Sequence, residues 1–179
     1  MPGVLFTKRF VGGLLVAATI TTGIATADAL SRIGQAATVS KRAVRVDPPQ
    51  AGSSTADLTA IVALINTERA RARLAPVAWH AQVGAAAMAH SIDQAVMNRM
   101  THIGSDGSDA GVRLTRAGFV WRAWGENVAA GHTSVQSVFN AWMGSAAHKA
   151  QILGDYLYVG LAASASGTGT VYWTLDFAR

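Results

Sequence analysis

The feature that most constrains the fold is the order of two hydrophobic repeats in the last third of the chain. Residues 133–144 carry apolar side chains at the three- and four-residue spacing of one helix face, namely Val135, Val138, Phe139, Trp142 and Met143. Residues 170–178 instead alternate in the period of a strand, with Val171, Trp173, Leu175 and Phe177 predicted to face the core. The Gly-rich turn "GTG" joins this strand to another predicted at residues 156–164. The pattern predicts a helix followed by a strand hairpin.

Two further helices are predicted upstream. The first starts at a cap on Thr55 or Asp57 and ends near the basic turn before Pro76, with Leu58, Ile61, Val62 and Ile65 on its apolar face. The second lies within residues 81–100, with its buried stripe predicted at Met88, Ile92, Ala95 and Val96. A loop at 101–111, a short helix at 112–118, a buried or strand-like segment at 124–131 and a short helix at 145–153 follow. Helices before and between antiparallel strands predict an α+β layered domain.

Composition limits the chain to one folded domain without covalent cross-links. It has 179 residues, 50% of them hydrophobic and only 14% charged, which is enough for one sizeable core. There is no cysteine. If the protein is exported, its core is therefore stabilised by burial rather than by disulfides.

The first residues have the pattern of an export signal. Lys8 and Arg9 precede an apolar run at 10–24, and Ala25 and Ala27 fit the small-x-small rule for cleavage. We therefore predict a signal peptide at 1–27, a flexible linker at 28–54 and a folded domain at 55–179. The apolar run is shorter than the ~20 residues that span a bilayer, so no transmembrane segment is expected after cleavage. Retention of the run as a membrane anchor is the less favoured alternative, because the run is short and contains Gly12, Gly13 and Gly23.

The distribution of charge argues against a nucleic-acid partner. The net charge of +5 arises mainly before the predicted domain, because residues 55–179 hold nine basic and eight acidic residues. A domain so close to neutral lacks the basic surface that binds phosphate backbones. The linker has four basic and two acidic residues, so it is predicted either to contact an anionic cell envelope or to be a solvated tail.

His102 and Glu126 are the polar residues with the most informative surroundings. His102 opens a Gly-rich loop, where side chains are displayed rather than packed. Glu126 lies between Gly125 and an apolar run, so we expect it to be partly buried and to need a polar partner. By contrast, His90 is predicted on the surface of the second helix, and His80 and His132 at helix or loop entries without a nearby acid.

The sequence contains none of the common catalytic motifs. The chain has no H-E-x-x-H, no G-x-S-x-G and no phosphate-binding glycine loop. Ser145 and His148 are one helical turn apart, which is the spacing of a nucleophile and its base. A serine at a helix start more commonly caps the backbone, and we expect this role for Ser145.

A series of segments in order resembles one known family. They are "LINTERARARL", "AAMAHSIDQAVMNRMTHIGSDG", "GVRLTRAGF", "WGENVAAG", "VFNAWMGSAAHKAQIL", "VGLA" and "YWTLDFA". Over residues 57–178 they resemble the CAP superfamily of cysteine-rich secretory, antigen 5 and pathogenesis-related proteins, and within it the bacterial secreted SCP-like branch. The resemblance implies a three-layer α-β-α sandwich with a central antiparallel sheet flanked by helices. It also implies a cleft in which His102, Glu126 and His148 converge.

The resemblance makes these three residues the candidate ligand-binding and catalytic groups. Two neutral imidazoles, His102 and His148, can hold Zn²⁺ or another divalent cation if Glu126 or water completes the site or orients a ring. A metal-bound water would then be available for hydrolysis. The alternative is a buried polar network that holds the loops to the sheet.

This chain departs from the family pattern in the same helix. Ser145 stands where the eukaryotic branch has a second glutamate, and Lys149 and Gln151 stand where bacterial members have arginine and asparagine. The missing carboxylate weakens any mechanism that needs two acids and leaves metal binding possible.

The predicted function is therefore a secreted binding protein, extracellular or periplasmic. Its cleft is expected to bind a divalent metal, a small apolar or lipid ligand, or both. The alternatives are a metal-dependent hydrolase of peptide, ester or cell-wall substrates and a non-catalytic envelope interaction protein.

Overall fold

The computed structural model describes residues 54–179. The predicted signal peptide and all but the last residue of the predicted linker lie outside the described residues. The elements are α1 (Thr55–Arg71), β1 (Ala78–Trp79), α2 (Ala81–Met97), α3 (Ala110–Arg116), β2 (Trp124–Ala130), α4 (Val135–Gly144), α5 (Ala146–Ile152), β3 (Tyr158–Ala165) and β4 (Val171–Ala178). Within residues 54–179, no helix combines the length and the apolar run needed to cross a membrane.

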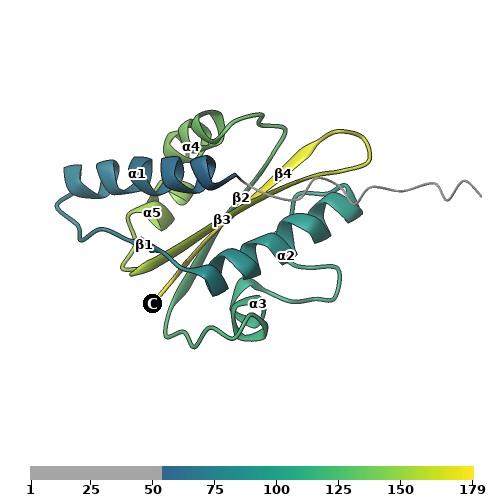
Figure 1. Cartoon of the computed structure of the whole chain (residues 1–179), viewed down its shortest axis with the longest axis horizontal. Helices are drawn as coiled ribbons and strands as arrows, with labels where there is room; N and C mark the ends of the chain where they lie inside the picture. The colour runs from purple at the N-terminus through teal and green to yellow at the C-terminus, as the bar shows by residue number, and fades with distance from the viewer. Residues whose placement is uncertain (1–53) are drawn as a thin grey trace, which may run out of the picture. The chain divides into compact units, whose positions relative to one another are not determined.

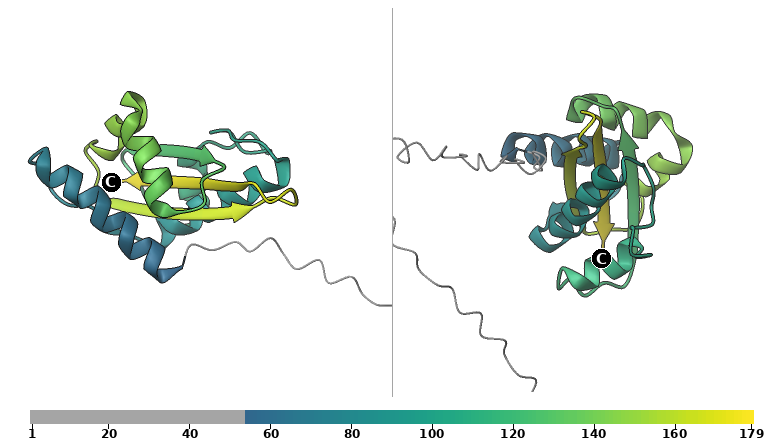
Figure 2. Two further views of the ribbon diagram at one scale, coloured as in Figure 1. Left: turned by 90° about the horizontal axis from the view of Figure 1, so that it is seen from above. Right: turned by 90° about the vertical axis from the view of Figure 1, so that its right-hand side faces the viewer.

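The four strands form one sheet between two helical layers. The strand order is β1-β3-β4-β2, in which β4 is antiparallel to both β3 and β2, and the two-residue β1 is parallel to β3. Helices α1, α4 and α5 lie on one face and α2 and α3 on the other (Figures 1 and 2). The predicted three-layer sandwich is confirmed, with short β1 as the parallel exception to an antiparallel sheet.

The larger apolar core lies between the sheet and α1, α4 and α5. The predicted apolar faces of α1 and α4 are confirmed: Ile61, Ile65, Val138 and Trp142 are fully or almost fully buried there. Alternate residues of β4 pack against them, as the strand pattern predicts. This layer follows directly from the hydrophobic periodicity of the sequence.

Polar groups fix both ends of α1. Ser54, rather than Thr55 or Asp57, caps the helix, and Asp57 completes a capping box by accepting from the Ser54 backbone. At the other end the buried guanidinium of Arg69 donates to the carbonyls of Ile152 and Gly154 at 3.0 and 2.7 Å. Arg69 thereby ties α1 to the segment between α5 and β3.

The predicted buried face of α2 is only partly right. Ala95 is buried as predicted, but Val96 is 75% exposed and Ile92 is also exposed. Apart from Val83, the buried residues of α2 are small or polar: Gly84, Ala86, Ala87, His90, Ser91, Gln94 and Ala95. The reason is distance, because a Cβ on Gly160 of β3 would overlap the backbone nitrogen of Gly84. Larger apolar side chains do not fit at so close a helix–sheet contact, so they face solvent.

The second face of β4 is also buried, beneath α2. Thr174 lies there, and its hydroxyl accepts from Ser91 and Gln94 at 3.0 Å each. Asp176 is the next polar residue on this face and is fully buried. The layer between α2 and the sheet is thus held by hydrogen bonds as well as by apolar contact.

The close contact between α2 and β3 predicts the effect of one methyl group. Gly160→Ala places a Cβ against the Val83 and Gly84 backbone, so we expect a loss of roughly 1–3 kcal/mol in the free energy of unfolding. Gly144→Ala is the control, because nothing lies within 4 Å of the position that its Cβ would take at the end of α4. Urea denaturation of both variants measures the difference; equal stability of the two would contradict the tight packing.

Candidate functional site

His102, Glu126 and His148 line one cavity of about 320 Å³. The loop after α2 contributes His102, β2 contributes Glu126, and α5 contributes His148. Asn127 and Gln151 add amide groups to the wall, and Ile103, Trp124 and several small residues supply its apolar part. The structure therefore brings the three predicted residues together from segments that are far apart in sequence.

Backbone contacts position His102 and His148. Asn98 ends α2 in a left-handed conformation with φ 48°, and the chain then turns so that the Thr101 N–H donates to the Gln94 side chain at 3.1 Å. On the other side, the Asn127 amide of β2 donates to the His148 carbonyl at 3.0 Å, which fixes α5 against the strand. Neither contact involves the imidazole rings, so both rings remain available to the cavity.

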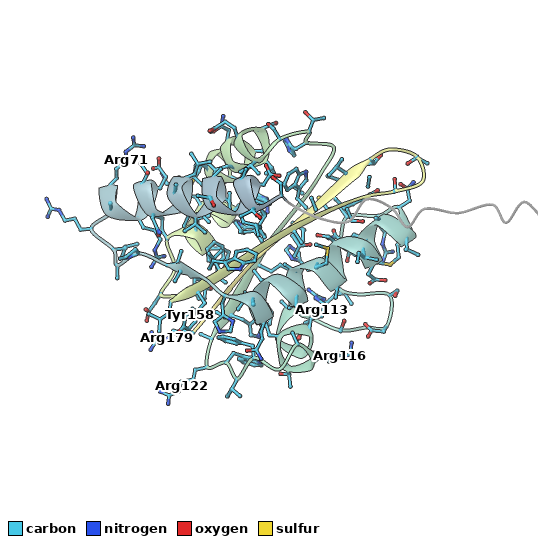
Figure 3. All side chains as sticks on the ribbon, viewed as in Figure 1. Arg71, Arg113, Arg116, Arg122, Tyr158 and Arg179 are labelled. Atoms are coloured by element: carbon cyan, nitrogen blue, oxygen red, sulfur yellow. The ribbon has the colours of Figure 1, made fainter. Side chains whose placement is uncertain are left out.

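Glu126 is buried and has two strong partners. Its Oε1 lies 2.7 Å from Nδ1 of His102, and its Oε2 accepts from the Arg113 guanidinium at 2.5 Å. Arg113 comes from α3, is itself buried, and also donates to the carbonyls of His102 and Ser108. Figure 3 shows the Arg113 side chain between α2 and α3, whereas Arg122 points outward. One guanidinium thus compensates the buried carboxylate and holds the loop that carries His102.

The two cavity histidines differ in their affinity for protons. The hydrogen bond to Glu126 raises the pKa of His102 above its ordinary value, although burial opposes this. Burial lowers the pKa of His148, and the nearby charge on His102 lowers it further. With Nδ1 donating to Glu126, Nε2 of His102 has no hydrogen-bond partner within residues 54–179 and presents a lone pair when the ring is neutral.

Three residues of the site were missed or misplaced by the sequence analysis. His90, predicted on the surface of α2, is 0% exposed; its Nε2 donates to the Thr101 carbonyl at 2.7 Å, and burial lowers its pKa. Arg113 was not singled out, although an arginine inside a short apolar helix needs an acceptor. Asp176 was also not singled out; it lies opposite Glu126 in the pairing of β2 with β4.

Ser145 does not share the cavity with His148. It occupies the N-cap position of α5, but its side chain makes no capping hydrogen bond, so that expectation is wrong. Ser145 is also not among the residues that line the cavity. Gln151 lines it, and its Oε1 accepts from the Tyr156 hydroxyl at 2.8 Å. A Cβ on Gly125 would overlap Gln151 Oε1 and the Tyr156 hydroxyl, so both side chains would have to move.

The comparison with known proteins places this geometry in a family. The model of the cysteine-rich secretory protein family, CAP, matches residues 62–177. The chain belongs to the CAP family. Despite the family's name, this CAP protein contains no cysteine.

Bacterial relatives share the CAP domain. The uncharacterized protein YkwD of Bacillus subtilis is 28% identical over 118 residues, which cover 65% of this chain and 45% of YkwD. An extracellular SCP-domain protein from Bacillus anthracis is 27% identical with a TM-score of 0.61, over 68% of this chain and 39% of the other. This chain therefore spans less than half the length of both relatives.

One structural neighbour shares the fold over nearly its full length. An outer surface protein of Borrelia burgdorferi has a TM-score of 0.66 at 17% identity, covering 73% of this chain and 98% of that protein. At that identity the likeness concerns the fold alone.

The ionisable side chains of this CAP cavity limit the kind of metal site it can form. Within the described part of the chain, no group of three or more His, Cys, Asp or Glu side chains is arranged to hold a metal ion. Glu126 already has a donor on each oxygen. Asp109 also lines the cavity, where its Oδ1 accepts from the Val112 N–H. A cation bound by the two imidazoles would therefore take its remaining ligands from water or a bound molecule.

The His102–Glu126 hydrogen bond predicts the titration of His102. Glu126→Gln removes the negative charge and should lower the His102 pKa, measured by NMR of the imidazole protons. Glu68→Gln, at an exposed pair with Arg71, is the control and should leave His102 unchanged.

The same pair predicts a pH dependence of stability. The folded-state pKa of His102 is raised. The contribution of the protonated ring to the free energy of unfolding is therefore fully present below the unfolded pKa of about 6.5, and it is lost as pH rises through the folded-state pKa. Both predictions depend on the NMR titration. A His102 pKa that is the same in Glu126→Gln as in the wild type would contradict the assigned hydrogen bond.

Proposed function

We propose that this CAP domain is a secreted binding module that holds a divalent metal ion, with Zn²⁺ as the leading candidate, through Nε2 of His102 and the imidazole of His148. The observation that carries the proposal is the 2.7 Å contact between His102 Nδ1 and Glu126. A carboxylate on Nδ1 fixes the ring and its tautomer and leaves Nε2 as the donor atom, which is the usual arrangement around a metal-binding histidine.

The surroundings of His148 support the same role. Its lowered pKa keeps this imidazole neutral, as a metal ligand must be, over a wider range of pH. His102 has the opposite shift, so protons compete with the metal there first. Zinc affinity should therefore fall as pH drops through the raised pKa of His102.

The incomplete ligand set favours an exchangeable ion over a structural one. Structural zinc sites usually have four protein ligands, whereas two imidazoles leave positions for water or a ligand group. Such positions also keep the alternative of a metal-dependent hydrolase open. Turnover of peptide, ester or cell-wall substrates that a chelator abolishes would promote that alternative over binding alone.

Export is part of the proposal. The N-terminal pattern of Lys8 and Arg9, an apolar run and Ala25-x-Ala27 supports a signal peptide. The relatives named above include an extracellular protein of Bacillus anthracis. We infer the same location, outside the cytoplasmic membrane, for this chain.

The metal proposal predicts the outcome of a zinc titration. His102→Ala and His148→Ala should each weaken zinc binding at least about tenfold in isothermal titration, because each removes one of two protein ligands. His132→Ala is the control, since His132 bonds Ser137 outside the cavity. Unchanged zinc affinity in the double variant of His102 and His148 would refute the site.

A second candidate function rests on a different surface. An apolar groove of about 510 Å³ runs along α1, lined by Leu58, Val62, Ala63 and Trp79 together with Thr55 and Thr59. It is large enough for part of an alkyl chain and has no charged side chain in its lining. We propose it as the place where a small apolar or lipid ligand would bind.

The groove predicts that the same substitution has different effects on ligand binding at two alanines of α1. Ala63→Glu puts a charged side chain into the groove and should abolish the change in tryptophan fluorescence, to which Trp79 of the groove contributes, on adding oleate. Ala60→Glu is the matched control, because Ala60 is exposed on the same helix and does not line the groove. Equal responses of the two variants would remove this candidate.

A further inference from the structure

Asp176 is a buried acid that the proposed function leaves without a role. It lies on β4 directly opposite Glu126 of β2 and is 0% exposed. Neither of its carboxyl oxygens accepts a hydrogen bond from any donor in the described residues. The antiparallel register nevertheless places the Asp176 and Glu126 side chains next to each other on one face of the sheet, where a hydrogen bond between the two carboxyl groups is possible. Two carboxyl groups form such a bond only when one of them carries a proton.

The charges around Asp176 identify which acid carries it. From α3, Arg113 is the single buried cation here among the described residues, and its guanidinium bonds Glu126 rather than Asp176. From α2, His90 faces Glu126 at 3.9 Å, and burial keeps this ring neutral. From β3, the residue opposite Asp176 is Gly160, which has no side chain. Two acids therefore lie near one cation, and only Glu126 forms an ion pair with it.

A second charge in this layer would be unpaired. Burying an ionised carboxylate without a cation or a donor is far more costly than burying the neutral acid. Glu126 has two donors and Asp176 has none within residues 54–179, so the negative charge belongs on Glu126.

We propose that Asp176 is a neutral carboxylic acid in the folded protein and donates its O–H to Glu126. Glu126 then accepts from three sides: His102, Arg113 and Asp176. Asp176 is a positioning residue, because it holds the carboxylate that in turn orients His102. Burial, and next the negative charge of Glu126, raise the pKa of Asp176 well above its ordinary value, which agrees with this assignment.

The proton on Asp176 does not depend on metal binding, whereas its influence on the metal ligand His102 rests on the proposed function. The test therefore uses the metal-free protein. Infrared spectra at neutral pH should contain the C=O band of a protonated carboxylic acid, and isotopic labelling of aspartate carboxyl groups should shift it. The band should be lost in Asp176→Asn and kept in Asp155→Asn, a control at the surface. The proposal is overturned if this band is absent from the wild-type spectrum or does not shift when aspartate is labelled. That result does not depend on the folding of any variant.

Two further measurements separate a neutral Asp176 from an ionised one. Asp176→Asn replaces one neutral donor by another, so the His102 pKa measured by NMR should change by less than about 0.3. An ionised Asp176 would help to stabilise the charged imidazole, and its removal would lower that pKa by more. A fall of this size would overturn the proposal.

The pH dependence of stability gives the second measurement. Since the folded-state pKa is raised, the wild-type contribution is full below the unfolded value of about 3.9 and is lost as pH rises through the folded value. Asp176→Asn has no such pH-dependent loss of stability. Its denaturation midpoint should therefore rise relative to that of the wild type as pH increases from about 4 to neutrality. A difference that does not vary with pH would contradict the assignment, and zinc titration of His102→Ala and His148→Ala decides the metal proposal separately.

Discussion

The buried ion pair between Arg113 and Glu126 joins the parts of this domain that form its cavity. Arg113 comes from α3, and Glu126 comes from β2. Because the same guanidinium also donates to the carbonyls of His102 and Ser108, it holds the loop after α2 above the sheet. A buried carboxylate without this cation would carry a large desolvation cost. The position of His102, and so the chemistry of the cavity, follows from that pairing.

The two helical layers meet the sheet by different means. On the side of α1, α4 and α5, large apolar side chains fill the space, as in most domain cores. On the side of α2, small residues allow a close approach at Gly84 and Gly160, and Ser91 and Gln94 donate to Thr174. The polar layer continues from Thr174 to Asp176 and Glu126, two residues further along the same strand face. Glu126, at the end of this line of polar residues, also lines the cavity.

In this arrangement one acid would serve both stability and the proposed metal binding. The Glu126 carboxylate is buried on its Arg113 side and contacts His102 on its cavity side. Its charge is thus available to the exposed imidazole without being exposed itself. A ring fixed through Nδ1 leaves Nε2 free for the proposed metal ion, and α5 contributes His148 to the same cavity.

The sequence by itself determined most of the secondary structure and three polar residues of the cavity. Hydrophobic periodicity predicted α1, α4 and the two long strands, and the family resemblance predicted the sandwich and the grouping of His102, Glu126 and His148. It did not identify the buried face of α2, where Val96 is exposed and His90 is inside. Apolar periodicity assumes that the most hydrophobic stripe faces inward, and this fails where space admits only small side chains.

Only the tertiary structure decided which acids and bases share a charge. Arg113, Glu126 and Asp176 come from three elements, and nothing in their local sequences pairs them. The antiparallel register places Asp176 beside Glu126, and the packing of α3 gives the cation to Glu126 alone. Protonation states in a buried cluster depend on distances and on the number of available partners, which a linear pattern does not contain.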